Sequence, residues 1–134
     1  TTISKVKDPE TGDEKWEPKG NSSEAPIVVA ARKIGFSENV SDEYKRVLEI
    51  PFSSSRKMMM TVSDISGRAE LCQGGMPLEK GASLLAVVKG APNFILDYCT
   101  EQLAEDGSTK PLSESDKASV LEIVDKYSSK ALRV

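Results

Sequence analysis

The sequence predicts an α+β fold, with an antiparallel β-sheet flanked by helices in a single domain. Apolar residues alternate with a period of two over residues 46–52 and 58–62, which is typical of strands. Apolar residues recur at helical spacing before these strands, over residues 23–34, and after them, over residues 113–131. The chain of 134 residues is 38% hydrophobic and 29% charged, a balance ordinary for one globular domain.

The N-terminal third is expected to hold a polar segment followed by one helix. Residues 1–19 combine charges with proline and glycine turn signals and show little apolar periodicity, so we expect a flexible or edge segment there and the domain proper over residues 20–134. Ser23 is expected to cap a helix that runs through Ile34, because Pro26 then falls in the first turn, where its missing N–H costs nothing. Gly35 is expected to end this helix.

The middle of the chain predicts a meander of strands. The strands over residues 46–52 and 58–62 are followed by a turn at Ser66-Gly67 and a further strand over residues 69–73. Residues 73–82 are rich in glycine and are expected to form a loop. The continuous apolar run from Leu84 to Val88 predicts a buried strand, with Lys89 at its exit.

Two helices are expected after the strands. Pro92 suits the first turn of a short helix, and Asp106-Gly107 separates this helix from the next element. Ser113 with Asp116 resembles a capping box, which predicts the start of the last helix.

Composition excludes several function classes. The sequence has no histidine, which removes the histidine-dependent nucleophile arrangements and the usual general base. A formal net charge of −3 gives no general attraction for nucleic acid or an anionic membrane, and the run from Leu84 to Val88 is far shorter than the roughly 20 residues that span a bilayer. Cys72 and Cys99 lack metal-ligand spacing, so buried thiols are expected and no metal site is predicted.

Three segments could carry chemistry, and each also has an ordinary structural interpretation. Phe52 precedes a polar turn with Arg56 and Lys57, so its ring could stack on a base while the cations meet phosphate, although such a ring is more often core. The segment from Lys89 to Pro92 could bring backbone close to a ligand at Gly90, or could be an ordinary strand-to-helix turn. Glu24 could accept a hydrogen bond from an exocyclic amine, or could be only a first-turn acid.

Taken in order, these segments resemble the nucleotide-binding domain of P-type ATPases, particularly the cation-pumping branch. Lys89-Gly90-Ala91-Pro92 resembles the family's Lys-Gly-Ala-Pro signature, and residues 52–59 resemble its phenylalanine, polar turn, Arg-Lys and methionine pattern. Residues 20–24 resemble its Gly-Asp-Pro-Thr-Glu pattern, and residues 131–134 resemble its closing Leu-Arg-Val run. The sequence departs from the family pattern at Ser22, Ser54 and Asn93, and the phosphorylated Asp-Lys-Thr-Gly motif is absent.

The resemblance implies roles for the matching residues. It places Phe52 on adenine, Glu24 on its amino group, and Gly90 and Ala91 as a close backbone wall. It also implies cations around the nucleotide, namely Lys57, Lys89 and Arg133. No residue of the chain is expected to be catalytic or to hold a metal.

The resemblance further implies a cytosolic domain of an integral membrane cation pump. Such a domain binds ATP, with Mg²⁺ held mainly by a phosphorylation domain elsewhere in the parent chain, and works with that domain and an actuator domain. No contact with nucleic acid and no direct membrane contact by this chain are expected. The alternative is a non-catalytic α+β interaction module whose basic turn binds a protein or anionic partner. An autonomous phosphotransfer enzyme is disfavoured, because histidine, a phosphate loop and a carboxylate cluster are lacking.

Overall fold

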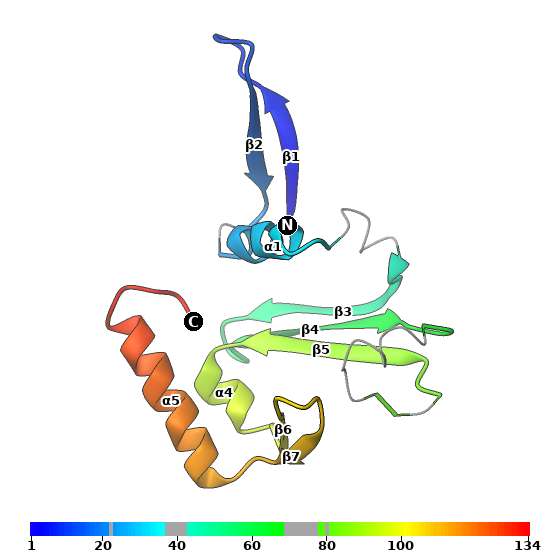
Figure 1. The fold of residues 1–134 in the computed structure, drawn as a ribbon, viewed down its shortest axis with the longest axis vertical. Helices are drawn as coiled ribbons and strands as arrows, with labels where there is room; N and C mark the ends of the chain where they lie inside the picture. Colours follow the sequence, from blue (N-terminus) through cyan, green and yellow to red (C-terminus); the bar gives the residue numbers. More distant parts are fainter. Residues whose placement is uncertain (22, 37–42, 69–77, 80) are drawn as a thin grey trace. The chain divides into compact units, whose positions relative to one another are not determined.

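A computed structural model describes residues 1–21, 23–36, 43–68, 78–79 and 81–134. The chain divides into two compact units, the N-terminal unit (Thr1–Glu43) and the C-terminal unit (Tyr44–Val134). Both units combine antiparallel strands with helix (Figure 1), so the predicted α+β class is confirmed. No helix within the described ranges is long and apolar enough to cross a membrane.

The N-terminal unit begins with a β-hairpin. Strands β1 (Thr2–Lys7) and β2 (Glu14–Lys19) pair antiparallel, and the Asp8 amide donates to the Asp13 carbonyl at 2.8 Å to close the connecting turn. Gly12 occupies this turn with a φ of +77°, a conformation that glycine adopts without strain. Most of residues 1–19 therefore lie in a paired hairpin, and the predicted domain boundary at residue 20 stays a prediction.

Helix α1 (Ala25–Lys33) follows the hairpin and packs against β1. Pro26 lies in its first turn, as predicted, and Gly35 follows its end with a φ of +99°. The prediction that Ser23 caps the helix is wrong, because the N-cap residue is Glu24. The Asn21 carbonyl accepts hydrogen bonds from the amides of Glu24 and Ala25, which places Ser23 inside the turn that precedes the helix.

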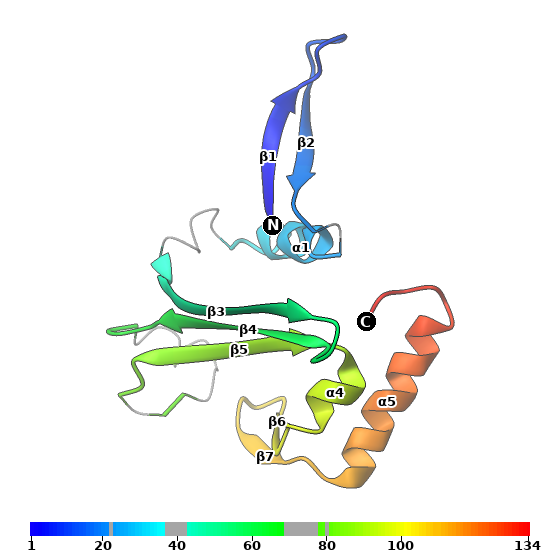
Figure 2. The same ribbon diagram turned by 180° about the vertical axis from the view of Figure 1, so that it is seen from behind.

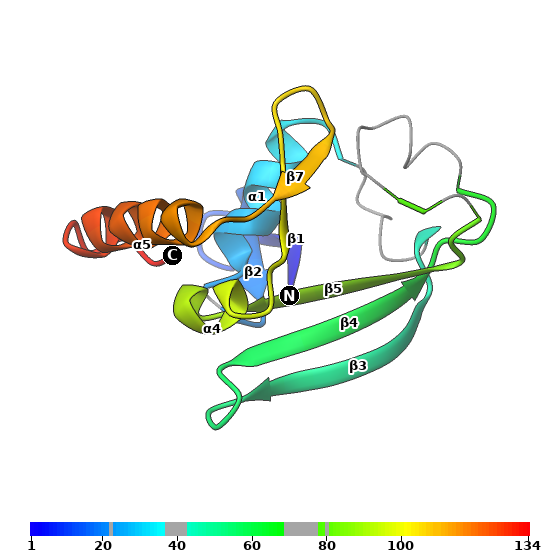
Figure 3. The same cartoon turned by 90° about the horizontal axis from the view of Figure 1, so that it is seen from below.

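The C-terminal unit is built on a three-stranded antiparallel sheet in the order β3-β4-β5. Its strands are β3 (Arg46–Ser53), β4 (Met58–Asp64) and β5 (Leu84–Gly90), which lie side by side in Figure 3. The three predicted strands and the turn at Ser66-Gly67 are thus confirmed. The strand expected over residues 69–73, most of the loop expected over residues 73–82, Cys72 and Ser22 lie outside the described residues.

Strand β5 is more exposed than its apolar sequence predicts. Leu84 is 56% exposed and Val87 is 51% exposed, so the prediction of a buried strand is wrong. Among the described residues, β5 lies at an edge of the sheet with β4 as its partner, and the side chains on both of its faces remain largely uncovered. An apolar run of this kind indicates a strand, but it does not show that both faces are covered.

Two helices and a small hairpin complete the C-terminal unit. Helix α4 (Pro92–Leu96) begins directly after β5, and helix α5 (Glu114–Ser128) packs beside it in both views of Figures 1 and 2. Between them lies a hairpin that was not predicted, formed by β6 (Glu101–Leu103) and β7 (Thr109–Pro111). Asp106-Gly107 lies in the turn of this hairpin.

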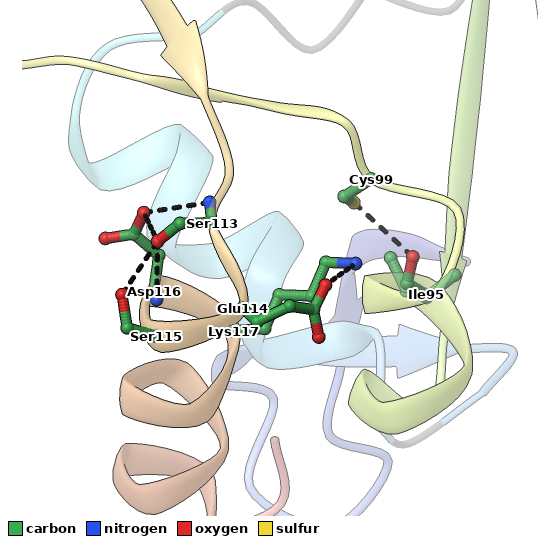
Figure 4. Close-up of polar contacts among 7 residues, drawn as sticks. All are labelled: Ile95, Cys99, Ser113, Glu114, Ser115, Asp116 and Lys117. Atoms are coloured by element: carbon green, nitrogen blue, oxygen red, sulfur yellow. Dashed lines mark hydrogen bonds and ion pairs between the residues drawn. The ribbon is translucent and has the colours of Figure 1, made fainter.

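The start of α5 shows the predicted capping box (Figure 4). The Ser113 hydroxyl accepts a hydrogen bond from the Asp116 amide at 3.2 Å, and the Asp116 carboxylate accepts one from the Ser113 amide at 3.0 Å. Cys99 follows α4, and its thiol donates a hydrogen bond to the Ile95 carbonyl at 3.4 Å. This thiol is half-buried and not buried as expected.

Candidate functional site

The sheet topology gathers several predicted site residues at one end of the C-terminal unit. Antiparallel pairing places the end of β3, the start of β4 and the end of β5 together, because Met58 pairs with both Ser53 and Gly90. Phe52 lies at that end of β3, and Lys57 lies in the turn that leads into β4. Together with Lys89, Gly90 and Ala91, these residues form what we call the sheet-end cluster.

The turn between β3 and β4 is fixed by its own hydrogen bonds. The Lys57 amide donates to the Ser53 carbonyl at 2.8 Å, and the Arg56 amide donates to the Ser53 hydroxyl at 3.2 Å. The Arg56 guanidinium turns back and donates to the Pro51 carbonyl at 2.7 Å. Arg56 therefore contributes to the shape of the turn, while the chain direction at Lys57 is set by a φ of +58°.

The backbones of Lys57 and Gly90 approach each other closely. The Ala91 amide donates to the Lys57 carbonyl at 2.9 Å. A β-carbon added at Gly90 would lie 2.3 Å from the Lys57 carbonyl oxygen and 2.7 Å from Met58 Cα, distances that real side chains do not show. Only glycine fits at position 90 without a shift of backbone, and this close approach joins the basic turn to the end of β5.

Phe52 presents its ring outward. It is 56% exposed although it lies in the largely apolar β3, so the structure does not use Phe52 as a core residue. A register shift in β3 lies between Ile50 and Ser53, which marks a bulge just where Phe52 occurs. Bulges re-aim side chains at the edges of sheets, and here the bulge accompanies an exposed aromatic face beside a basic turn.

Arg133 lies in the segment that follows α5. The chain turns back at Ala131, which has a φ of +59°, and the Leu132 amide donates to the Tyr127 carbonyl at 3.2 Å. Figures 1 and 3 show the C-terminus on the same side of the C-terminal unit as α4 and the end of β5. The arrangement thus directs the closing segment toward the end of the sheet that carries the cluster.

Glu24 lies in the N-terminal unit, so its predicted contact with the nucleotide stays a prediction. Its carboxylate accepts a hydrogen bond from the Thr1 hydroxyl at 2.6 Å, and the same hydroxyl accepts from the Asn21 amide at 3.2 Å. Gly20 makes this arrangement possible, because a β-carbon there would lie 3.0 Å from Thr1 Cα. The turn that resembles the family's first motif is therefore held by contacts within its own unit.

Carboxylates of the sheet do not lie in the cluster. Asp64 pairs with Leu84 at the opposite end of β4, where hydrogen bonds from the Ser66 hydroxyl and amide hold the pKa of Asp64 below its ordinary value. Among the described residues, no three His, Cys, Asp or Glu side chains gather in a way that could hold a metal ion. The chemistry that the cluster offers is an aromatic face, cations and a closely packed backbone.

Comparison with known proteins identifies the family. The model of the P-type ATPase cytoplasmic domain N matches residues 2–134, so the chain belongs to this family and the resemblance found in the sequence is confirmed. One model covers nearly the whole chain, as expected for one domain.

The relatives are cation-transporting ATPases. The chain is 37% identical over 133 residues to "P-type sodium-transporting ATPase4" of Toxoplasma gondii, covering 87% of this chain and 10% of the relative. It is 33% identical over 153 residues to the Plasmodium falciparum protein of the same name, covering 100% of this chain and 12% of the relative. It is 31% identical over 121 residues to "Probable cation-transporting ATPase F" of Mycobacterium tuberculosis, covering 90% of this chain and 11% of the relative. The chain thus spans about a tenth of the length of these relatives.

Proposed function

We propose that this chain binds ATP at the sheet-end cluster and, within a parent P-type ATPase, presents the nucleotide to an aspartate of a separate phosphorylation domain. The observation that carries the proposal is the convergence of an exposed Phe52 ring with the Lys57 turn and the Gly90-Ala91 backbone at one end of the sheet. An exposed aromatic face beside cations suits an adenine ring with a polyphosphate tail.

The proposed roles follow from this chemistry. Adenine stacks on Phe52, and the ammonium groups of Lys57 and Lys89 neutralise phosphate charge. Gly90 and Ala91 form a wall beside the nucleotide, and the close packing of Gly90 on the backbone of Lys57 and Met58 holds this wall in place. Two further contacts complete the proposed site, Glu24 to the adenine amino group and Arg133 to phosphate.

Mg²⁺ is proposed to arrive with the nucleotide. The sheet-end cluster contains cations and no carboxylate, so its donor set does not suit a divalent cation, which prefers oxygen ligands. We propose that the phosphorylation domain holds the metal, while this chain supplies affinity and orientation for ATP. The actuator domain of the same parent chain is the other proposed partner.

The parent is proposed to be an ATP-driven cation translocase. The relatives include the sodium-transporting ATPases described above and, in Bacillus subtilis, a protein named "Calcium-transporting ATPase", so the proposal extends to a cation without choosing one. In such a pump the aspartyl phosphate drives conformational changes that move the ion across the membrane. This chain carries no Asp-Lys-Thr-Gly acceptor motif, and it is therefore proposed to be inactive alone.

Replacement of Phe52 tests the proposed site. We expect ATP to bind the intact chain with Kd on the order of 0.1 to 10 mM, and Phe52→Ala to weaken binding by about 1 to 3 kcal/mol, the range for loss of one base stack. Tyr98→Ala is the matched control, because Tyr98 is an aromatic residue that is 76% exposed and lies outside the cluster. Unchanged affinity of a folded Phe52→Ala variant would remove Phe52 from the site.

Incubation with ATP labelled at its terminal phosphate tests the proposed inactivity. We expect unlabelled protein and unchanged nucleotide in the presence of Mg²⁺, because phosphoryl transfer requires an in-line nucleophile that this chain does not supply. A stable label on the chain, abolished by Lys89→Ala, would show a complete active site and would contradict the proposal.

A further inference from the structure

An apolar pocket lies in the N-terminal unit between the β1–β2 hairpin and α1. Its volume is about 540 Å³, which falls within the range of small-molecule sites. The hairpin contributes Ile3, Trp16 and Pro18, and α1 contributes residues that include Val29 and Lys33. The pocket shares no residue with the proposed nucleotide site, and Figures 1 and 2 show the base of the hairpin against α1.

The lining offers few hydrogen-bonding groups. Pro18 and Pro26 have no backbone N–H, and the other lining side chains apart from Trp16 and Lys33 are aliphatic. A sugar or a nucleobase placed there would leave its own donors and acceptors unpaired, which is costly. The pocket therefore favours a ligand whose body is apolar.

Two cations lie near the Trp16 ring. The Lys5 ammonium lies 5.5 Å from the centroid of the ring, and the Arg32 guanidinium lies 5.8 Å from it. Lys5 also pairs with Glu14 at 2.9 Å, so its charge is partly balanced. Trp16 is nevertheless 55% exposed, which leaves part of its ring open beside two cations.

The side chain of Lys33 also contributes to the lining of this pocket. Lys33 lies in the last turn of α1 and is exposed. Within the part of the chain that the structure describes, its ammonium group makes no ion pair. A ligand with a carboxylate beside Lys33 would complement this charge.

We propose that this pocket binds a small amphipathic carboxylate. The apolar body of the ligand packs against Trp16, Pro18 and Val29, and its carboxylate pairs with the Lys33 ammonium. Because the charged contact is made by an exposed side chain, burial of the apolar body supplies most of the affinity and Lys33 supplies the preference for an anion.

Trp16 provides a direct signal for this binding, since it is the only tryptophan in the chain. The intact chain is titrated separately with sodium octanoate, 1-octanol and octylammonium chloride, which share one alkyl chain and differ in charge. We expect saturable changes in Trp16 fluorescence with octanoate at millimolar concentrations, weaker binding of octanol, and the weakest binding of octylammonium.

Variants separate the charged contact from the apolar one. Lys33→Met should weaken octanoate binding by about three- to five-fold, the effect of one exposed ion pair, and leave octanol binding unchanged. Lys7→Met is the matched control, because Lys7 is an exposed lysine of the same unit that does not line the pocket. Ala30→Phe should fill the pocket and remove the binding of both ligands, with folding checked by circular dichroism.

The proposal is overturned if octanoate produces no saturable change. It is equally overturned if octanol binds as tightly as octanoate. Unchanged octanoate affinity in either variant, folded Lys33→Met or folded Ala30→Phe, would also overturn it.

Discussion

Gly90→Ala should lower the unfolding stability of the chain more than the same substitution at Gly67, an exposed turn glycine with open space around it. The added β-carbon would lie 2.3 Å from the Lys57 carbonyl oxygen and 2.7 Å from Met58 Cα, and both are backbone atoms that cannot rotate away. Relief requires β4 and β5 to separate locally, which strains the packing at a cost of about 1 to 3 kcal/mol. It also weakens the hydrogen bond from the Ala91 amide to the Lys57 carbonyl, which contributes about 0.5 to 1.5 kcal/mol. The expected loss of stability is therefore about 1.5 to 4.5 kcal/mol.

Urea unfolding measures this loss, and thermal unfolding should show a decrease in Tm on the order of 10 °C. Gly67→Ala is the matched control, because it adds the same methyl group where nothing lies within 4 Å. Its φ of +74° makes alanine cost about 1 to 2 kcal/mol through the backbone alone. If Gly90→Ala were no less stable than Gly67→Ala, the close approach of Lys57 and Gly90 would be refuted.

Three further predictions concern the last helix and its end. Ser113→Ala should destabilise the chain by about 1 kcal/mol in urea unfolding, because it removes the side chain that caps α5; an unchanged midpoint would contradict the capping box. Hydrogen bonds from the Ser113 hydroxyl and amide hold the pKa of Asp116 below its ordinary value. The stabilisation by this carboxylate is therefore complete above the unfolded pKa of about 3.9, and it is lost as pH falls through the lower folded pKa. Accordingly, Asp116→Asn should have a lower Tm than wild type at pH 7, with the difference disappearing in acid, and a difference independent of pH would argue against this linkage. Ala131→Gly should raise stability by about 0.5 to 1 kcal/mol, because Ala131 has a φ of +59° that glycine adopts without strain; a loss of stability would show that the alanine methyl group makes a compensating contact.

Local signals predicted the elements that are held by local forces. The capping box at Ser113 fixed the start of α5, and the alternation in residues 46–52 and 58–62 indicated the two strands that the structure shows. The predicted N-cap of α1 is one residue too early. The Asn21 carbonyl accepts hydrogen bonds from the amides of Glu24 and Ala25, which places Ser23 in the preceding turn and makes Glu24 the N-cap, and this contact has no signal in the sequence. The β6–β7 hairpin was missed, since strands of three residues carry too little alternation to detect.

The candidate site was only partly predictable. The motif around Gly90 indicated close backbone approach, but the partner of that approach depends on the register between β4 and β5, which pairs residues far apart in sequence. The exposure of Phe52 could not be predicted from its position, because an aromatic residue at a strand end is more often core, whereas this ring is 56% exposed. The role of Arg56 in holding the turn through the Pro51 carbonyl had no sequence signal at all.

An amide chemical-shift titration of the intact chain with ATP tests the central claim most directly. The proposed function predicts that the amides of Phe52, Lys57, Lys89 and Gly90 shift along one saturable isotherm. Adenosine should reproduce the shifts near Phe52, and tripolyphosphate should reproduce weakly those near the lysines. The absence of a saturable shift at several millimolar ATP would contradict the claim. Shifts confined to the basic turn and fully reproduced by tripolyphosphate would also contradict it, because they would indicate a module that binds anions without recognising the nucleotide.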